Sequence, residues 1–167
     1  MITSPEFDFY WSQLENSDFI ILSVYLVVSI IPFLNSAREK TSIALAMVLS
    51  LLLVMFVRFS FSILELDFNE IHFFSLYPFL ADDPTQIYRF FTSAWLHGGW
   101  IHVLGNILVI GLVGVPLEQR LGAKRWLLVY FLGFLGGNLA WVLSHPDSIS
   151  PAIGASGAAF GLLGAYM

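Results

Sequence analysis

The chain has 167 residues, of which 57% are hydrophobic and only 11% charged, and its formal net charge is -5. About a quarter of the residues of soluble globular domains are charged, so this composition argues against a water-soluble fold. No basic patch suggests nucleic acid as a partner, and the lack of cysteine excludes disulfides, thiolate nucleophiles and Cys-ligated metal centres. We therefore expect an integral membrane protein.

Two apolar segments near the N-terminus predict two transmembrane helices. A polar, acidic stretch, residues 1–18, precedes the uncharged run Phe19–Leu34. A signal peptide would need a basic leader, and residues 1–18 contain no Lys or Arg, so we expect the run to remain as a helix. The second run, Thr41–Leu64, is interrupted by Arg58, which can reach toward the membrane surface or face a protein partner. Residues 19–64 are thus expected to cross the membrane twice.

A longer mixed segment follows. Residues 65–93 combine acids, prolines and aromatic side chains, a composition typical of the headgroup layer. Further spans are predicted from about Ala94 to Leu117 and from Trp126 to Leu143, and a fifth begins near Gly154. At ~1.5 Å per residue the fifth covers about 21 Å by Met167, short of the ~30 Å hydrocarbon core. We expect the chain to end inside a helix that continues.

Basic residues concentrate in two short loops, which predicts the orientation of the chain. One loop joins the first two spans and the other joins the third and fourth, and such loops face the cytoplasm. The N-terminus, the 65–93 segment and the Ser144–Ile153 loop then lie outside. We therefore predict a multi-pass protein of the cell membrane with an extracytoplasmic N-terminus. The loop residues are Arg38, Lys40, Arg120, Lys124 and Arg125.

Three polar side chains lie in the outer part of the third predicted span: His97, His102 and Asn106. A polar group in lipid needs a partner or a cavity, so the three form a candidate functional site. His102 and Asn106 are four residues apart and share a helix face. Hydrogen bonding between helices remains an alternative. A zinc site is disfavoured, because the spacing of His97 and His102 does not put both on one helix face and no carboxylate completes a ligand set.

Ser156 opens the fifth predicted span, between glycines in the sequence Gly154-Ala155-Ser156-Gly157. Gly157 and Gly161 also form a small-xxx-small pair, so close helix packing is one explanation of this composition. The predicted orientation places Ser156 at a membrane depth similar to that of His102. Free backbone N–H groups at a helix N-terminus suit an oxyanion. Ser156 is therefore a candidate nucleophile.

Four short motifs occur in order between Tyr77 and Met167. They are Tyr88-Arg89-Phe90-Phe91-Thr92, the set of His97, His102 and Asn106, Glu118-Gln119-Arg120-Leu121-Gly122, and Gly154-Ala155-Ser156-Gly157. The ordered set resembles the rhomboid family of intramembrane serine proteases. The resemblance implies an all-α, polytopic membrane helix bundle with an extra N-terminal span. Residues 94–167 would form part of the rhomboid core, truncated within its fourth helix.

The same resemblance assigns roles to the candidate residues. Ser156 would be the nucleophile, His102 and Asn106 would donate to the oxyanion, and His97 would support them. The implied reaction is hydrolysis of a peptide bond in or next to a transmembrane helix of a protein substrate, with no metal or organic cofactor. A pair of Glu118 and Arg120 would hold the cytoplasmic end together.

The resemblance also concerns glycines. Gly133, Gly136 and Gly137 would let neighbouring helices approach closely. The small residues of the fifth span, Gly157, Gly161 and Gly164, are expected to need a partner that residues 1–167 do not supply.

One feature of the family has no counterpart in the sequence. The rhomboid base is a histidine on the sixth core helix in a glycine-containing stretch, and neither His72 nor His145 lies in such a context. A serine without a base is a poor nucleophile, so we expect the chain alone to be nearly inactive.

A noncatalytic rhomboid-like protein that binds transmembrane segments is one alternative function. A small transporter or channel is another, although the apolar stretch Ile107–Val113 argues against a polar pathway across the bilayer. The sequence does not indicate an oligomeric state.

Overall fold

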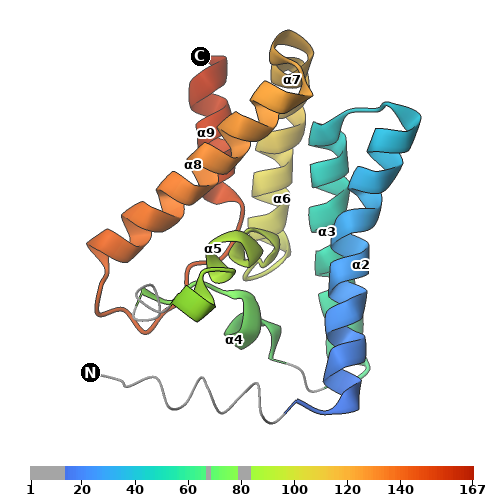
Figure 1. Ribbon diagram of the computed structural model, residues 1–167, viewed down its shortest axis with the longest axis vertical. Helices are drawn as coiled ribbons and strands as arrows, with labels where there is room; N and C mark the ends of the chain where they lie inside the picture. The colour runs from blue at the N-terminus through green and yellow to red at the C-terminus, as the bar shows by residue number, and fades with distance from the viewer. Residues whose placement is uncertain (1–13, 67–68, 79–83) are drawn as a thin grey trace.

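The computed structural model describes residues 14–66, 69–78 and 84–167 (Figure 1). In these ranges four helical stretches are long and apolar enough to cross a membrane. The protein is thus an all-α bundle of membrane helices, as the sequence predicts. Most of the predicted polar N-terminus, residues 1–13, lies outside the described residues. The four stretches belong to α2 (Asn16–Glu39), α3 (Ile43–Ile63), the continuous run from α6 to α7 (Trp100–Leu121) and α8 (Ala123–Ser144).

Helices α2 and α3 form an antiparallel pair at one side of the bundle (Figure 1). A capping box starts α2, in which the Glu15 backbone N–H donates to the Asp18 carboxylate over 2.8 Å. The turn between the helices passes through Lys40 in the left-handed region, at φ 53°. Ser42 then caps α3 by accepting from the Leu45 N–H. The pair places α3, but not α2, against the centre of the bundle.

The third span begins at Trp100 rather than at the predicted Ala94. Ser93–Trp95 form a 3₁₀ turn (η3), and the chain stays irregular up to Gly99. Adjacent glycines, Gly98 and Gly99, explain the late start, because each disfavours a helix by about 1 kcal/mol. This shift puts His97 in a turn before the helix.

The third span also contains a π-helical stretch that the sequence pattern does not predict. It comprises Ile110–Gly114 (η4), between α6 (Trp100–Val109) and α7 (Val115–Leu121). Pro116 lies in the first turn of α7 and has no N–H to continue the α-helical ladder, which gives a physical reason for the change of register.

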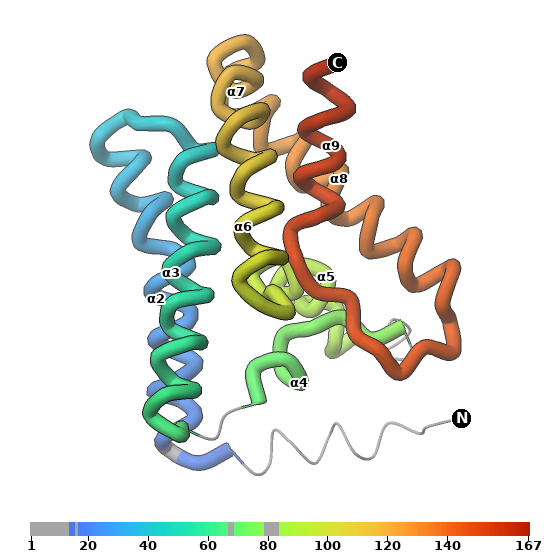
Figure 2. Tube along the Cα trace, turned by 180° about the vertical axis from the view of Figure 1, so that it is seen from behind, coloured from blue at the N-terminus to red at the C-terminus, as the bar shows by residue number. Residues whose placement is uncertain are grey.

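The segment between α3 and α6 contains only short helices. These are α4 (Glu70–Phe74), η2 (Pro84–Gln86), α5 (Arg89–Thr92) and η3. Arg89 is buried within the segment and donates to the carbonyls of His72 and Ser75. Both views place the segment at one end of the bundle, beside the loop that leads into α9 (Ser156–Tyr166) (Figures 1 and 2).

Helices α8 and α9 approach so closely that their backbones touch. A Cβ added at Gly133 would stand 2.9 Å from the Gly157 carbonyl oxygen and 2.9 Å from the Gly161 Cα, and one at Gly137 would stand 3.1 Å from the Gly157 Cα. Gly157 and Gly161 therefore already have their partner, in contrast to the prediction. Gly136 and Gly164 make no such approach, since nothing lies within 4 Å of a Cβ added at either. Figure 2 shows that α9 also runs beside α6.

At the other end of the bundle, Glu118 and Arg120 do not bind each other. The Glu118 carboxylate accepts from the Ser42 hydroxyl over 2.5 Å and from the Ile43 and Ala44 N–H groups over 2.9 Å each. It therefore caps the start of α3. The Arg120 guanidinium instead lies 4.9 Å from the centre of the Tyr166 ring in α9. The prediction of a pair was wrong because α7 turns the two side chains toward different helices.

Candidate functional site

His97 lies at the centre of the candidate site and is 1% exposed. Its Nδ1 faces the Trp95 carbonyl oxygen at 3.3 Å, and its Nε2 faces the Asn106 Nδ2 at 2.9 Å and the Ala155 N–H at 3.4 Å. A carbonyl only accepts, so Nδ1 must carry the proton and Nε2 must accept from the two donors. Burial lowers the pKa of His97 to about 4, and the nearby His102 and Arg58 act in the same direction. The imidazole is therefore neutral and has a fixed tautomer.

His102 lies on the first turn of α6 and is half-buried. Its ring meets that of His97 edge-on, with centres 4.9 Å apart. The two histidines do not share a helix face, as their spacing predicts, but they still meet because His97 lies in the turn before the helix. The His102 Nδ1 accepts from the Gly98 N–H at 3.4 Å, so in the neutral ring Nε2 carries the proton. His102 therefore offers an N–H donor at Nε2.

Gly154 brings the loop before α9 against that donor. A Cβ added at Gly154 would stand 2.7 Å from both Cε1 and Nε2 of His102, and 3.5 Å from the Asn106 Nδ2. Its φ of +103° is also in the region that favours glycine. No other residue fits between this backbone and the two side chains without a shift. Gly154 and Ala155, the two residues before Ser156, thus contact His102, Asn106 and His97.

The loop is held from its other side by the segment between α3 and α6, which we call the interfacial segment. The Gly154 N–H donates to the Ser93 carbonyl over 2.8 Å, and Leu76 and Ala152 exchange two backbone hydrogen bonds of 3.1 and 2.7 Å. Asn138 of α8 supports Ser93, since its Nδ2 donates to the Ser93 hydroxyl at 3.2 Å. These contacts fix the entry into α9.

Ser156 is the first residue of α9 and is half-buried. Backbone N–H groups in the first turn of a helix have no partner within the helix, so they can bind a negative charge. The structure thus gathers the four predicted residues, Ser156, His102, Asn106 and His97, around one loop. His97 holds Asn106, and among the described residues neither the His102 Nε2–H nor the second N–H of the Asn106 amide has a hydrogen-bond partner.

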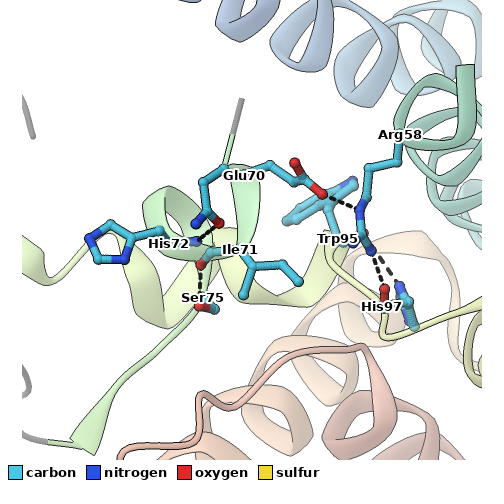
Figure 3. A network of polar contacts seen from close by, with 8 residues as sticks. Arg58, Glu70, Ile71, His72, Ser75, Trp95 and His97 are labelled. Atoms are coloured by element: carbon cyan, nitrogen blue, oxygen red, sulfur yellow. Dashed lines mark hydrogen bonds and ion pairs between the residues drawn. The ribbon is translucent and has the colours of Figure 1, made fainter. Parts of the chain in front are cut away.

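Two further residues contribute and were missed as site residues. Arg58 of α3 binds the Glu70 carboxylate through Nε and the His97 carbonyl through Nη1 (Figure 3). Asn138 holds Ser93, as described above. Both are isolated polar residues in apolar spans, which is a signal that such a side chain has a partner in the protein.

The two other histidines lie apart from this site. His145 stacks on Trp141 with ring centres 4.1 Å apart and its Nδ1 is 2.8 Å from the Ser144 hydroxyl. The ring of His72 lies near that of Tyr77, with centres 6.2 Å apart. Within the described residues no group of three or more His, Cys, Asp or Glu side chains could hold a metal ion.

Comparison with known proteins places these observations in a family. The family model described as the Rhomboid domain matches residues 84–167. The chain is similar to RHOMBOID-like protein 1 of Arabidopsis thaliana, with 45% identity over 49% of the chain and 21% of that protein. It is also similar to Rhomboid-related protein 3 of Homo sapiens, with 39% identity over 49% of the chain and 20% of that protein. Similarity to Rhomboid-like protease 3 of Toxoplasma gondii is 38% over 47% of the chain and 29% of that protein.

The chain thus spans less than a third of the length of these relatives. No solved structure matches it. The matched region, residues 84–167, is half of the chain and contains the candidate site apart from Arg58, Glu70 and Leu76. The chain belongs to the rhomboid family.

Proposed function

We propose that the complete protein is an intramembrane serine endopeptidase that cleaves peptide bonds in or next to the transmembrane helices of its substrates, with Ser156 as nucleophile. One observation carries the proposal. Gly154 packs on the Nε2 side of His102 and on the Asn106 amide, the Ala155 N–H donates to His97, and Ser156 follows as the first residue of α9. Ser156 and the N-terminus of α9 therefore lie within two residues of a backbone position that contacts both side-chain donors.

This arrangement suits acyl transfer. The Ser156 Oγ would attack the scissile carbonyl, and the carbonyl oxygen would gain negative charge. Donors aimed at that oxygen are the Ser156 backbone N–H, the His102 Nε2–H and the free N–H of Asn106. The substrate helix must unwind locally, because its carbonyls are otherwise hydrogen-bonded along the backbone.

The general base is not one of the two site histidines. The Nε2 lone pair of His97 accepts from Asn106 and Ala155, and the Nδ1 lone pair of His102 accepts from Gly98. The proposed reaction therefore needs a base that these two residues do not supply. For the same reason the second candidate function is a noncatalytic protein of the same family that binds transmembrane segments.

The proposed orientation puts the site end of the bundle outside the cytoplasm of the cell membrane, with the N-terminus on the same side. It is supported by the connections α2–α3 and α7–α8, which lie together at the opposite end and carry most of the basic residues (Figure 1). The chain has no cysteine, so single substitutions can be labelled cleanly. In intact cells Ser150→Cys should react with an impermeant maleimide, and Lys124→Cys only after permeabilisation. The reverse pattern would contradict the orientation.

The decisive experiment is cleavage of a fluorogenic transmembrane peptide by the complete protein in liposomes. Ser156→Ala should abolish cleavage and labelling by a serine-directed phosphonate, while α9 still packs against α8 because Ala is equally small. Asn106→Ala should lower kcat by about 10²-fold without abolishing it, since other donors remain.

Trp100→Phe is the control, because this exposed residue has one aromatic contact within the described residues, with the Phe59 ring, and should keep full activity. Full activity in Ser156→Ala, or phosphonate labelling of another serine, would reject the proposed nucleophile. Binding of transmembrane peptides without any cleavage would favour the noncatalytic function.

A further inference from the structure

Arg58 is a charged residue in the outer half of an apolar membrane helix. A guanidinium in this position is costly unless protein groups satisfy it. The Arg58 and Glu70 side chains are 19% and 17% exposed, and they form an ion pair between α3 and α4. Because the pair is largely buried, its two members depend on each other, and removing one leaves the other without compensation.

The second hydrogen bond of Arg58 leads into the candidate site. Nη1 of the same guanidinium donates to the carbonyl oxygen of His97, so one planar group joins α3, α4 and the turn before α6 (Figure 3). The ring of His97 lies at the other end of these contacts, where Nε2 accepts from Asn106 and Ala155. Ala155 is the residue directly before Ser156.

We propose that Arg58 and Glu70 are positioning residues for the site, an inference that rests on the proposed function. Glu70 orients the guanidinium, the guanidinium fixes the backbone of His97, and His97 in turn orients the Asn106 amide and the Ala155 N–H. The interfacial helix α4 is thereby coupled to the oxyanion donors. A change in the position of α4 at the membrane surface would alter the site through this chain of contacts.

Arg89 provides the comparison for a role in structure alone. It is also a buried arginine, and among the described residues it donates to the backbone carbonyls of His72 and Ser75 and to the Gln86 side chain, which belong to the interfacial segment. Arg58 differs because one of its partners is the backbone of a site residue. Loss of either arginine should lower thermal stability, whereas only loss of Arg58 should change the environment of the His97 ring.

The variants Arg58→Lys, Glu70→Gln and Arg89→Lys separate these roles. A lysine has one nitrogen and cannot give two N–H groups in a fixed fork, so Arg58→Lys keeps the charge and loses the bridge. The readouts for the 1–167 chain in nanodiscs are the ¹⁵N resonances of the His97 ring and the side-chain NH₂ resonances of Asn106. Both should shift in Arg58→Lys and in Glu70→Gln, and stay near wild type in Arg89→Lys. If Arg58→Lys does not fold, Glu70→Gln alone decides.

In the complete protein, the amount of Ser156 that reacts with the phosphonate gives the concentration of active sites. Relative to that concentration, the variants Arg58→Lys and Glu70→Gln should lower kcat about tenfold and change KM less than twofold, because the donors would be misplaced rather than removed. Unchanged His97 and Asn106 resonances in both variants would overturn the inference, as would a wild-type kcat in Arg58→Lys. A wild-type protein without Ser156-dependent cleavage would reject the proposed function, and the resonances would still decide whether Arg58 and Glu70 position His97.

Discussion

Helix α9 is held in two different ways at its two contact regions. Along its side, glycines bring its backbone against that of α8, so that a Cβ added at Gly133 would stand 2.9 Å from backbone atoms of α9. At its start, the Gly154 and Ala155 N–H groups donate directional hydrogen bonds to the Ser93 carbonyl and to His97 Nε2. The contact between α8 and α9 depends on glycines, which have no side chain. The contact at the start of α9 depends on particular donors and acceptors and on the protonation of His97. Steric contact therefore sets where the helix lies, and the polar contacts set how the nucleophile and its donors are oriented.

The largest expected effect comes from adding a side chain to the steric contact. Gly133→Leu should lower the free energy of unfolding by more than about 3 kcal/mol, because the new atoms meet backbone on two sides and neither α9 glycine can give way. Thermal unfolding in detergent measures the loss. Gly136→Leu is the matched control in the same helix, where nothing lies within 4 Å, and it should be near neutral. Equal losses in the two variants would show that the backbone contact does not hold α9.

The polar contact should respond to pH, unlike the steric one. The pKa of His97 is lowered in the folded protein from an ordinary value of 6.5 to about 4, so the unfolded chain binds a proton more readily. The stability that His97 contributes is complete above pH 6.5 and is lost as the pH falls toward 4, by about 3 kcal/mol.

Unfolding followed between pH 7.5 and 4 measures this loss, and comparison with His97→Gln isolates it, since glutamine does not titrate. The variant should be less stable at pH 7.5 and show a flatter pH profile. If the two profiles are parallel, His97 is not the group responsible.

A smaller effect is expected from the polar contact at the other end of the bundle. Glu118→Gln should lower the free energy of unfolding by about 2 kcal/mol, because the amide NH₂ would face a donor among Ser42, Ile43 and Ala44. Urea or thermal unfolding measures it. Glu39→Gln is the control, since the Glu39 side chain is 59% exposed and its ion pair with Arg38 is on the surface. A loss as large in the control would mean that charge, rather than the cap of α3, is responsible.

Much of this fold could be predicted from apolar runs, because lipid allows few alternatives to a helix. The site residues were predictable because a polar side chain in such a run needs a hydrogen-bond partner or a cavity in the protein. What the sequence could not supply is the local geometry. The start of α6 at Trp100 depends on two glycines, and it alone brings His97 onto His102. Composition also did not distinguish Gly133, which touches α9, from Gly136, which faces away from it, because both occur in one small-residue stretch.

The link between Leu76 and Ala152 uses only main-chain atoms, with N–H groups and carbonyls exchanged in both directions. A contact of this kind does not depend on which side chains occupy the two positions, provided that neither is proline. Related chains can therefore change many residues of the interfacial segment and still keep the two backbone hydrogen bonds that attach it to the loop before Ser156. Sequence divergence in that segment is thus compatible with an unchanged attachment to the site. Slow hydrogen exchange of the Leu76 and Ala152 amides would reveal this attachment, whereas a sequence alignment would not.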